Sequence, residues 1–175
     1  MVTLRPATPS DALCISALAT QVFLDTYATD GMRNDLAREV ERECGRAAVE
    51  AWLADAANRI LLAEQDGHLI AFALWRLGGR GEANAPHEEP QHGDAELVRL
   101  YVQRYFHGQG IGRLLLSKVE TDAGHAGSAR LWLTAWVGNA KALAFYAKEG
   151  YVNIGSTDYV FEGRSYENRV FEKVL

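Results

Sequence analysis

The segment from Glu96 to Thr121 constrains the fold more than any other part of the chain. Residues Glu96 to Val102 are mainly apolar, β-branched or aromatic, which predicts a mostly buried strand. From Gly110 to Thr121 apolar residues recur at helical spacing, which predicts a helix. The turn between the two elements has the sequence His107-Gly108-Gln109-Gly110-Ile111-Gly112.

This turn predicts a site for an anion. Glycines at 108, 110 and 112 let the backbone turn sharply and leave no Cβ in the way of a ligand. The N–H groups of the helix's first turn, together with the helix dipole, favour a phosphate there. A Walker A loop is excluded because Gly112-Arg113-Leu114 stands where Gly-Lys-Ser/Thr is needed, and G-x-G-x-G is not the dinucleotide spacing. An ordinary glycine-rich turn is the alternative.

The N-terminal half predicts a strand, helices and a hairpin. The charged face of the second helical region, Arg38 to Glu43, is expected to face solvent. Asp66-Gly67 between two apolar runs predicts a tight hairpin. The predicted elements are a strand at Val2–Pro6, a helix capped by Ser10 and running to about Leu24, with Phe23–Tyr27 closing it, a helical region at Asn34–Asn58 broken at Gly45, and strands at Arg59–Gln65 and His68–Leu77.

The C-terminal half predicts three strands and one helix. Arg130 to Val137 is a strand by composition. Asn139 is the expected N-cap of a helix that Gly150 ends. Val152–Phe161 and Tyr166–Val174 are the expected closing strands. Before Glu96, the polar segment Gly78–Gly93 predicts a loop.

Composition narrows the class of protein. The 175 residues fit one domain, 1–175, and the net charge of −5 argues against a nucleic-acid surface. Cys14 and Cys44 lack metal-type spacing and indicate a reduced, cytoplasmic protein. The sequence shows no membrane span and no signal-peptide pattern. His87, Glu88, Glu89 and His92 have the right chemistry for a metal but nothing to hold its geometry, so no metal site is expected.

Two motifs together resemble those of the GNAT N-acetyltransferases. The strand matches the family pattern E-x-x-R-L-Y-V, and the turn resembles the acetyl-coenzyme A loop Q/R-x-x-G-x-G/A, with His107 in place of the opening Gln or Arg. Asn139 to Tyr151 resembles the second signature, N-x-x-A-x-x-F-Y-x-x-x-G-Y/F. The resemblance covers about the whole chain. Arg104 or a protonated His107 is expected to supply the missing charge.

The resemblance implies a fold and a cosubstrate. The fold is a single-domain α/β GNAT fold, with a mixed, mostly antiparallel twisted sheet, splayed central strands and helices on both faces. The cosubstrate is acetyl-coenzyme A, whose pantetheine arm would pair with the backbone near Leu100 and Val102. The residues that the resemblance assigns to cosubstrate binding are Leu100, Tyr101, Val102, His107, Gly108, Gln109, Gly110, Ile111, Gly112, Arg113, Asn139 and Lys148.

The same resemblance implies direct transfer of the acetyl group to an amine. Tyr146 is the candidate acid near the thioester sulfur, and packing of its ring is the alternative. Glu96 is the candidate base, acting through water, and a surface glutamate is the alternative. Some relatives carry a glutamate at the position of Val98 instead.

The acceptor is the least determined part of the function. The layout resembles that of bacterial polyamine acetyltransferases, with Asp25, Tyr27 and Trp136 expected to contact the amine. Acidic residues at 82, 88, 89, 94 and 96 favour a polycation, with only Arg80 offsetting them nearby. The alternatives are a protein N-terminus or lysine, an aminoglycoside, and a regulatory domain that binds acyl-coenzyme A without turnover. The sequence leaves open whether the protein is a homodimer.

Overall fold

The computed structural model describes residues 1–78, 94–161 and 163–175. The predicted loop at Gly78–Gly93 falls outside this range except for its first residue, as do His87, Glu88, Glu89 and His92. The elements in chain order are β1 (Val2–Pro6), η1 (Pro9–Asp11), α1 (Ala12–Tyr27), α2 (Asn34–Cys44), α3 (Arg46–Ala54), β2 (Asn58–Gln65), β3 (His68–Leu77), β4 (Ala95–Val102), η2 (Arg104–Phe106), α4 (Ile111–His125), β5 (Arg130–Trp136), α5 (Ala140–Lys148), β6 (Val152–Phe161) and β7 (Arg164–Val174).

The strands form one seven-stranded sheet in the order β1-β2-β3-β4-β5-β7-β6. β1 pairs with β2, β5 with β7 and β6 with β7, all antiparallel. β4 and β5 are parallel, as expected of strands joined through a helix. The predicted α/β fold with a mixed, mostly antiparallel sheet is confirmed.

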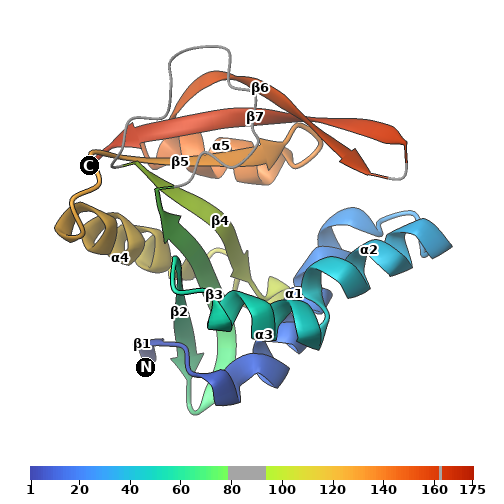
Figure 1. Ribbon diagram of the computed structural model, residues 1–175, viewed down its shortest axis with the longest axis horizontal. Coiled ribbons are helices and arrows are strands. Elements are labelled where there is room, and N and C mark those ends of the chain that lie inside the picture. Colours follow the sequence, from blue (N-terminus) through green and yellow to red (C-terminus); the bar gives the residue numbers. More distant parts are fainter. Residues whose placement is uncertain (79–93, 162) are drawn as a thin grey trace. The chain divides into compact units, whose positions relative to one another are not determined.

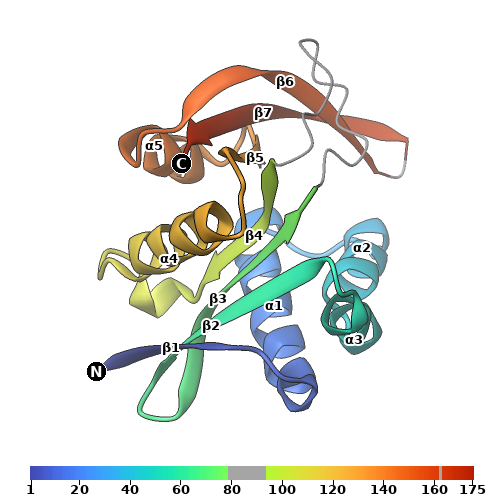
Figure 2. The same cartoon turned by 60° about the vertical axis from the view of Figure 1, so that its left-hand side comes forward.

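The chain forms two compact units, which are described separately. The first unit contains residues 1–75 and 99–119. In it, α1, α2 and α3 lie together beside the strands β1 to β3 (Figure 2). Ile15, Val49, Leu62 and Phe72 are completely buried. Each such side chain contributes roughly 1.5–3 kcal/mol by leaving water, so this packing stabilises the unit more than any ion pair does.

The second unit contains residues 76–98 and 120–175. Its largest feature is the long hairpin of β6 and β7, with β5 alongside β7 and α5 packed against these strands (Figure 1). Leu131 and Leu133 of β5 are buried, as are Val170 and Phe171 of β7.

Two predictions based on glycine are confirmed. Asp66 and Gly67 have φ of 52° and 78°, as a tight turn between two strands requires. Gly45 separates α2 from α3, and any Cβ there would collide with the carbonyl oxygen of Glu41. The break therefore requires glycine for steric reasons.

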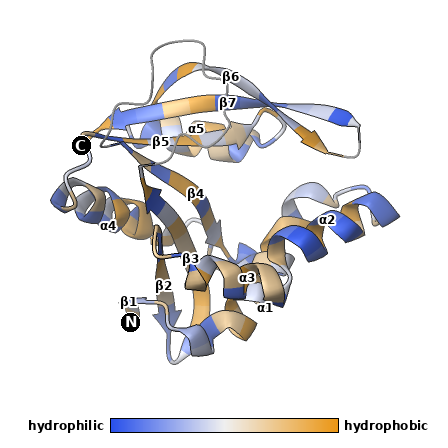
Figure 3. Cartoon of the chain, in the orientation of Figure 1, coloured by the Kyte–Doolittle hydropathy of each residue, from blue (hydrophilic) through white to orange (hydrophobic). Residues whose placement is uncertain are grey.

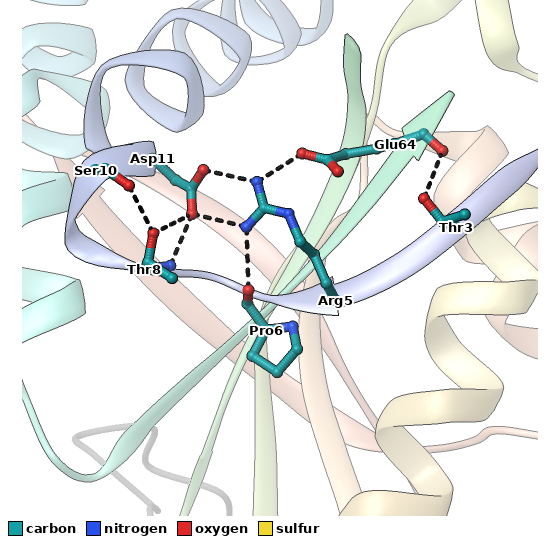
Figure 4. A network of polar contacts seen from close by, with 7 residues as sticks. All are labelled: Thr3, Arg5, Pro6, Thr8, Ser10, Asp11 and Glu64. Carbon is teal, nitrogen blue, oxygen red and sulfur yellow. Dashed lines mark hydrogen bonds and ion pairs between the residues drawn. The ribbon is translucent and has the colours of Figure 1, made fainter. Parts of the chain in front are cut away.

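The predicted start of α1 was wrong. Ser10 is not the N-cap, because it lies inside the 3-10 turn η1, whose own N-cap is Thr8. The residue at the N-cap of α1 is Asp11. The Thr8 N–H and hydroxyl donate to Asp11 Oδ2 at 2.7 and 2.8 Å. Arg5 donates to both oxygens of Asp11 at 2.8 Å and to Glu64 at 2.6 Å (Figure 4). This network joins β1, η1 and β2.

Other boundaries differ by a few residues. α1 continues to Tyr27 and β7 begins at Arg164. α3 ends at Ala54 rather than Asn58, because Asp55 accepts from the Ala57 N–H and the Asn58 amide donates to the Trp52 carbonyl. α4 continues to His125, since Ala123 extends its buried face. It ends where Gly127 adopts a φ of 93°.

The charged face of α2 is not wholly solvated, which corrects the prediction. Figure 3 shows α2 as largely hydrophilic, yet Glu39 is only 5% exposed. Arg42 donates to both of its carboxylate oxygens at 2.7 Å. A carboxylate so deeply buried needs such a partner, because losing water without one is costly.

Candidate active site

The end of β4 is held firmly within the first unit. Arg99 donates to Glu43 at 2.6 Å, and its guanidinium lies 4.7 Å from the centre of the Trp52 ring. The Gln103 N–H donates to the Ile70 carbonyl at 2.9 Å, and its side chain donates to Gln21 at 2.9 Å. β4 is thus fixed to α1, α2, α3 and β3 just before the glycine turn. The contacts of Arg99 are structural ones that its place in the motif did not predict.

The glycine turn is stabilised by a hydrogen bond within the turn, and the space beside Gly108 and Gly110 is free of other protein atoms. Gly108 and Gly110 have φ of 76° and 79°, and a Cβ on either would meet no atom within 4 Å. The Gln109 amide folds back to donate to the Tyr105 carbonyl at 3.1 Å. α4 begins at Ile111, and the N–H groups of a first helical turn lack intrahelical partners. This is the geometry that an anion site requires.

His107 is also engaged within the turn. Its Nε2 lies 2.9 Å from the Val102 carbonyl oxygen. A carbonyl oxygen can only accept, so Nε2 carries the proton and donates. The imidazole therefore joins residues 107–113, here called the cradle, to Val102, the last residue of β4. Arg104 and Arg113 are exposed on either side of His107 in the sequence.

The pairing of β4 with β5 is short. In the described part of the second unit, the ladder joins Ala95 to Leu131 and Glu96 to Trp132, and it does not extend to Leu97 or Val98. The two strands part just after Glu96. That is the behaviour the family resemblance predicts for the central strands.

Glu96 lies at the end of this ladder. Its carboxylate is 2.6 Å from the guanidinium of Arg76 in β3, and its side chain is 14% exposed. Burial raises the pKa of Glu96, and Arg76 opposes that rise by charge and hydrogen bonding. The expectation that only Arg80 would offset the local acidic charge was wrong, because Arg76 neutralises Glu96 directly.

Tyr146 lies on α5 inside an aromatic cluster. It is 9% exposed, and its ring centre lies 5.2, 5.7 and 6.2 Å from those of Phe145, Tyr151 and Phe171. The helix is oriented by Asn139, whose Oδ1 accepts from the Ala142 N–H at 3.1 Å. The prediction that Asn139 is the N-cap of this helix is therefore confirmed, and its side-chain oxygen is used in that hydrogen bond. Lys148, at the other end of α5, is exposed.

Trp136 is the last residue of β5, and its ring lies directly beside Gly138. Any Cβ on Gly138 would collide with the Trp136 indole. The Asn139 N–H donates to the Trp136 carbonyl at 2.9 Å, which makes the connection to α5 a tight turn. The half-buried indole is held at the end of the strand.

Glu96 and Tyr146 lie on opposite faces of the sheet in the second unit. Paired residues point to the same face, so Glu96, Trp132 and Glu172 share one face. Tyr146 packs on Phe171, which is paired with Leu133 and faces the other way. The acid and the base expected from the sequence therefore do not share one face of the sheet.

The residues predicted to contact the amine divide between the units. Asp25 and Tyr27 end α1 in the first unit, where Asp25 is exposed and the Tyr27 ring packs 4.6 Å from Phe23. Trp136 belongs to the second unit, as do Glu96, Asn139, Tyr146 and Lys148, whereas Leu100 to Arg113 belong to the first.

Sequence reasoning missed Arg76. An arginine near the end of the otherwise apolar strand His68–Leu77 signals a carboxylate partner. The identity of that partner depends on strand register, which the local sequence does not give.

The described residues contain neither a membrane-spanning helix nor a cluster of metal ligands. Among them, no helix is long and apolar enough to cross a membrane. Within the same residues, no group of three or more His, Cys, Asp or Glu side chains could hold a metal ion.

Comparison with known proteins agrees with this geometry. A profile of the acetyltransferase (GNAT) family matches residues 26–151. The chain is 28% identical over 159 residues to an uncharacterised N-acetyltransferase of Mycobacterium bovis, covering 91% of this chain and 94% of that protein.

Two solved structures share the fold. PaiA N-acetyltransferase from Thermoplasma acidophilum, in complex with coenzyme A, has a TM-score of 0.78 at 18% identity, covering 100% of this chain and 99% of that one. YncA, a putative acetyltransferase from Salmonella typhimurium with acetyl-coenzyme A, has a TM-score of 0.68 at 19% identity, covering 100% and 94%.

Proposed function

Since this chain belongs to the acetyltransferase (GNAT) family and is an acetyl-coenzyme A-dependent N-acetyltransferase, we propose that its acceptor is the primary amine of a small polyamine. The observation that carries the acceptor class is charge. The chain has a net charge of −5, and its carboxylates gather in sequence before and at the start of β4. A negative surface concentrates a polycation and holds its distal ammonium groups.

Fewer of the acidic residues carry unpaired negative charge than the sequence suggests, because Glu96 is paired with Arg76. Glu96 is bound to Arg76, whereas Asp94 is half-buried and Asp25 is exposed. Residues 82, 88 and 89 lie outside the described range. The proposal therefore rests on the charge of the sequence. Asp25 and Tyr27 in the first unit, and Asp94 and Trp136 in the second, are the described residues proposed to contact the amine.

We assign the cosubstrate's phosphates to the cradle. The N–H groups of Ile111, Gly112 and Arg113 would receive the pyrophosphate, with Arg113 or Arg104 adding charge. The edge of β4 near Leu100 and Val102 would pair with the pantetheine arm, as a peptide adds to a sheet edge. The His107 ring, which donates to the Val102 carbonyl, lies at the same end of β4.

The transfer assigned to this site is direct. The neutral amine nitrogen attacks the thioester carbon, the C–N bond forms, the C–S bond breaks and the electron pair leaves with sulfur. Tyr146 gives its proton to that sulfur, producing the free thiol. Glu96 takes the proton of the amine through a water molecule, and its raised pKa brings it closer to the pH at which a base works best.

A panel of amines tests the acceptor. Thiol release from acetyl-coenzyme A would be measured with spermidine, spermine, a monoamine of similar length, a lysine peptide and an aminoglycoside. Spermidine or spermine is expected to give the highest kcat/KM. Equal values for polyamine and monoamine at low salt would reject the polyamine assignment, and faster turnover of the peptide or aminoglycoside would replace it.

A further inference from the structure

Tyr146 rests against a second tyrosine that is itself firmly held. The rings of Tyr146 and Tyr151 meet edge to face, with centres 5.7 Å apart. The Tyr151 N–H donates to the Tyr146 carbonyl at 3.0 Å. Tyr151 is 4% exposed, so its ring forms part of the wall around Tyr146. Whatever fixes Tyr151 therefore also limits how the Tyr146 ring can move.

Glu120 of α4 fixes Tyr151. The Tyr151 hydroxyl donates to Glu120 Oε1 at 3.0 Å. Lys173 of β7 donates to both oxygens of the same carboxylate, at 2.9 and 3.0 Å. The Lys173 Nζ also lies 5.5 Å from the centre of the Tyr151 ring. One carboxylate thus binds a phenol and an ammonium from two other parts of the second unit.

The chemistry separates the roles of the two tyrosines. Burial, then the adjacent Glu120 carboxylate, raise the pKa of Tyr151 well above its usual range. Its hydroxyl stays protonated and committed to Glu120. Because the Tyr151 hydroxyl is bound to Glu120, Tyr146 is the phenol of the pair to which the acid role is assigned.

We propose that Glu120, Tyr151 and Lys173 are positioning residues, which hold the Tyr146 ring where its hydroxyl can protonate the leaving sulfur. This inference rests on the proposed acid role of Tyr146. The physical reason is that proton transfer requires close alignment, and a small misplacement of a catalytic group costs much of its rate. Rings held only by packing can tilt, whereas a ring tied by a charged hydrogen bond is restrained.

Tyr151→Phe is the direct test, because it keeps the ring and deletes the bond to Glu120. With the fastest amine of the panel, kcat is expected to fall about 3–10-fold while KM for acetyl-coenzyme A stays within about twofold. In a Tyr146→Phe background the same change is expected to cause no further loss of kcat. Such non-additivity is the signature of a residue that acts through another.

Two further variants control for structure. Glu172 neighbours Lys173 in β7 but points to the opposite face of the sheet, where its carboxylate lies 3.4 Å from the Arg130 guanidinium. Glu172→Gln removes this carboxylate and should leave kcat unchanged. Glu120→Gln keeps an acceptor for Tyr151 and should retain more activity than Glu120→Ala, with thermal melting recorded for each.

The outcomes are distinguishable. An unchanged kcat, or an equal loss in both backgrounds, would overturn the positioning role while Tyr146 keeps its own. If Tyr146→Phe alone is harmless, the acid assignment and this inference fail together, although acetyl transfer itself is still observed. Because the assay uses any amine that turns over, rejection of the polyamine does not affect it.

Discussion

Tyr146 combines a packed ring with a phenol that the proposed chemistry needs. Tyr146→Phe preserves the contacts of the ring with Phe145, Tyr151 and Phe171. A general acid contributes about 10²–10⁴-fold, so the loss should appear in kcat with little change in KM or melting temperature. Steady-state kinetics check this. A kcat within about threefold of the parent would assign Tyr146 to packing alone.

Glu96 should make the rate depend on pH in a way that Arg76 modifies. A carboxylate base works only when ionised, so kcat/KM should fall as the pH drops through the raised pKa of Glu96. Arg76→Gln removes the cation that lowers this pKa and leaves the burial that raises it. The acidic limb should therefore move to higher pH.

Glu96→Gln is the companion variant. It should lose activity at neutral pH and recover it at high pH, where the amine is deprotonated without a base. A pH–rate profile identical to that of the parent would exclude Glu96 as the base.

Among the elements, the turn before α4 determines binding of the cosubstrate. Gly110→Asn places a side chain in the space assigned to the pyrophosphate, at a φ that asparagine tolerates better than most residues. The affinity for acetyl-coenzyme A should fall at least about tenfold, equivalent to ~1.4 kcal/mol, measured by calorimetry.

Gly67→Asn is the matched control. Gly67 has a φ of 78° against 79° for Gly110, and a Cβ at either meets no atom within 4 Å. It lies in the β2–β3 hairpin rather than the cradle. Equal affinities of the two variants would contradict the cradle assignment.

The network that joins β1, η1 and β2 predicts acid sensitivity. The Arg5 guanidinium holds the pKa of Asp11 well below its usual range. The stabilisation is present above the unfolded-state pKa, near 3.9, and is lost as the pH falls through the folded-state pKa. Asp11→Asn should cost about 1 kcal/mol at pH 7, a modest figure because Arg5 is 38% exposed and water screens the pair.

Urea unfolding at several pH values checks this. The difference between parent and Asp11→Asn should shrink steadily from pH 5 towards pH 2. A difference that is independent of pH would mean that shape, not charge, accounts for the effect.

At the scale of the whole molecule, the net charge of −5 should appear in the kinetics of a cationic acceptor. Exposed charges are screened over roughly 8 Å at physiological salt. KM for spermidine should rise with ionic strength, while KM for a monoamine changes less and kcat stays nearly constant for both. If KM for spermidine does not depend on salt, long-range attraction between the negative protein and the cationic acceptor does not contribute to binding.

The sequence by itself determined the features that depend on neighbouring residues. The Asp66-Gly67 hairpin, the break at Gly45, the N-cap at Asn139 and the glycine turn before α4 were all predicted correctly. Each depends on backbone conformations or hydrogen bonds within a few residues. The same local logic failed at Ser10, because Thr8 and Asp11 formed a competing turn.

Only the tertiary structure decided which charged groups are paired. Arg76 with Glu96, Arg99 with Glu43 and Lys173 with Glu120 are separated by 20, 56 and 53 residues. The strand register also placed Glu96 and Tyr146 on opposite faces of the sheet, since a shift of one residue would reverse the face. Pairing and facing depend on how distant segments align, which no local pattern encodes.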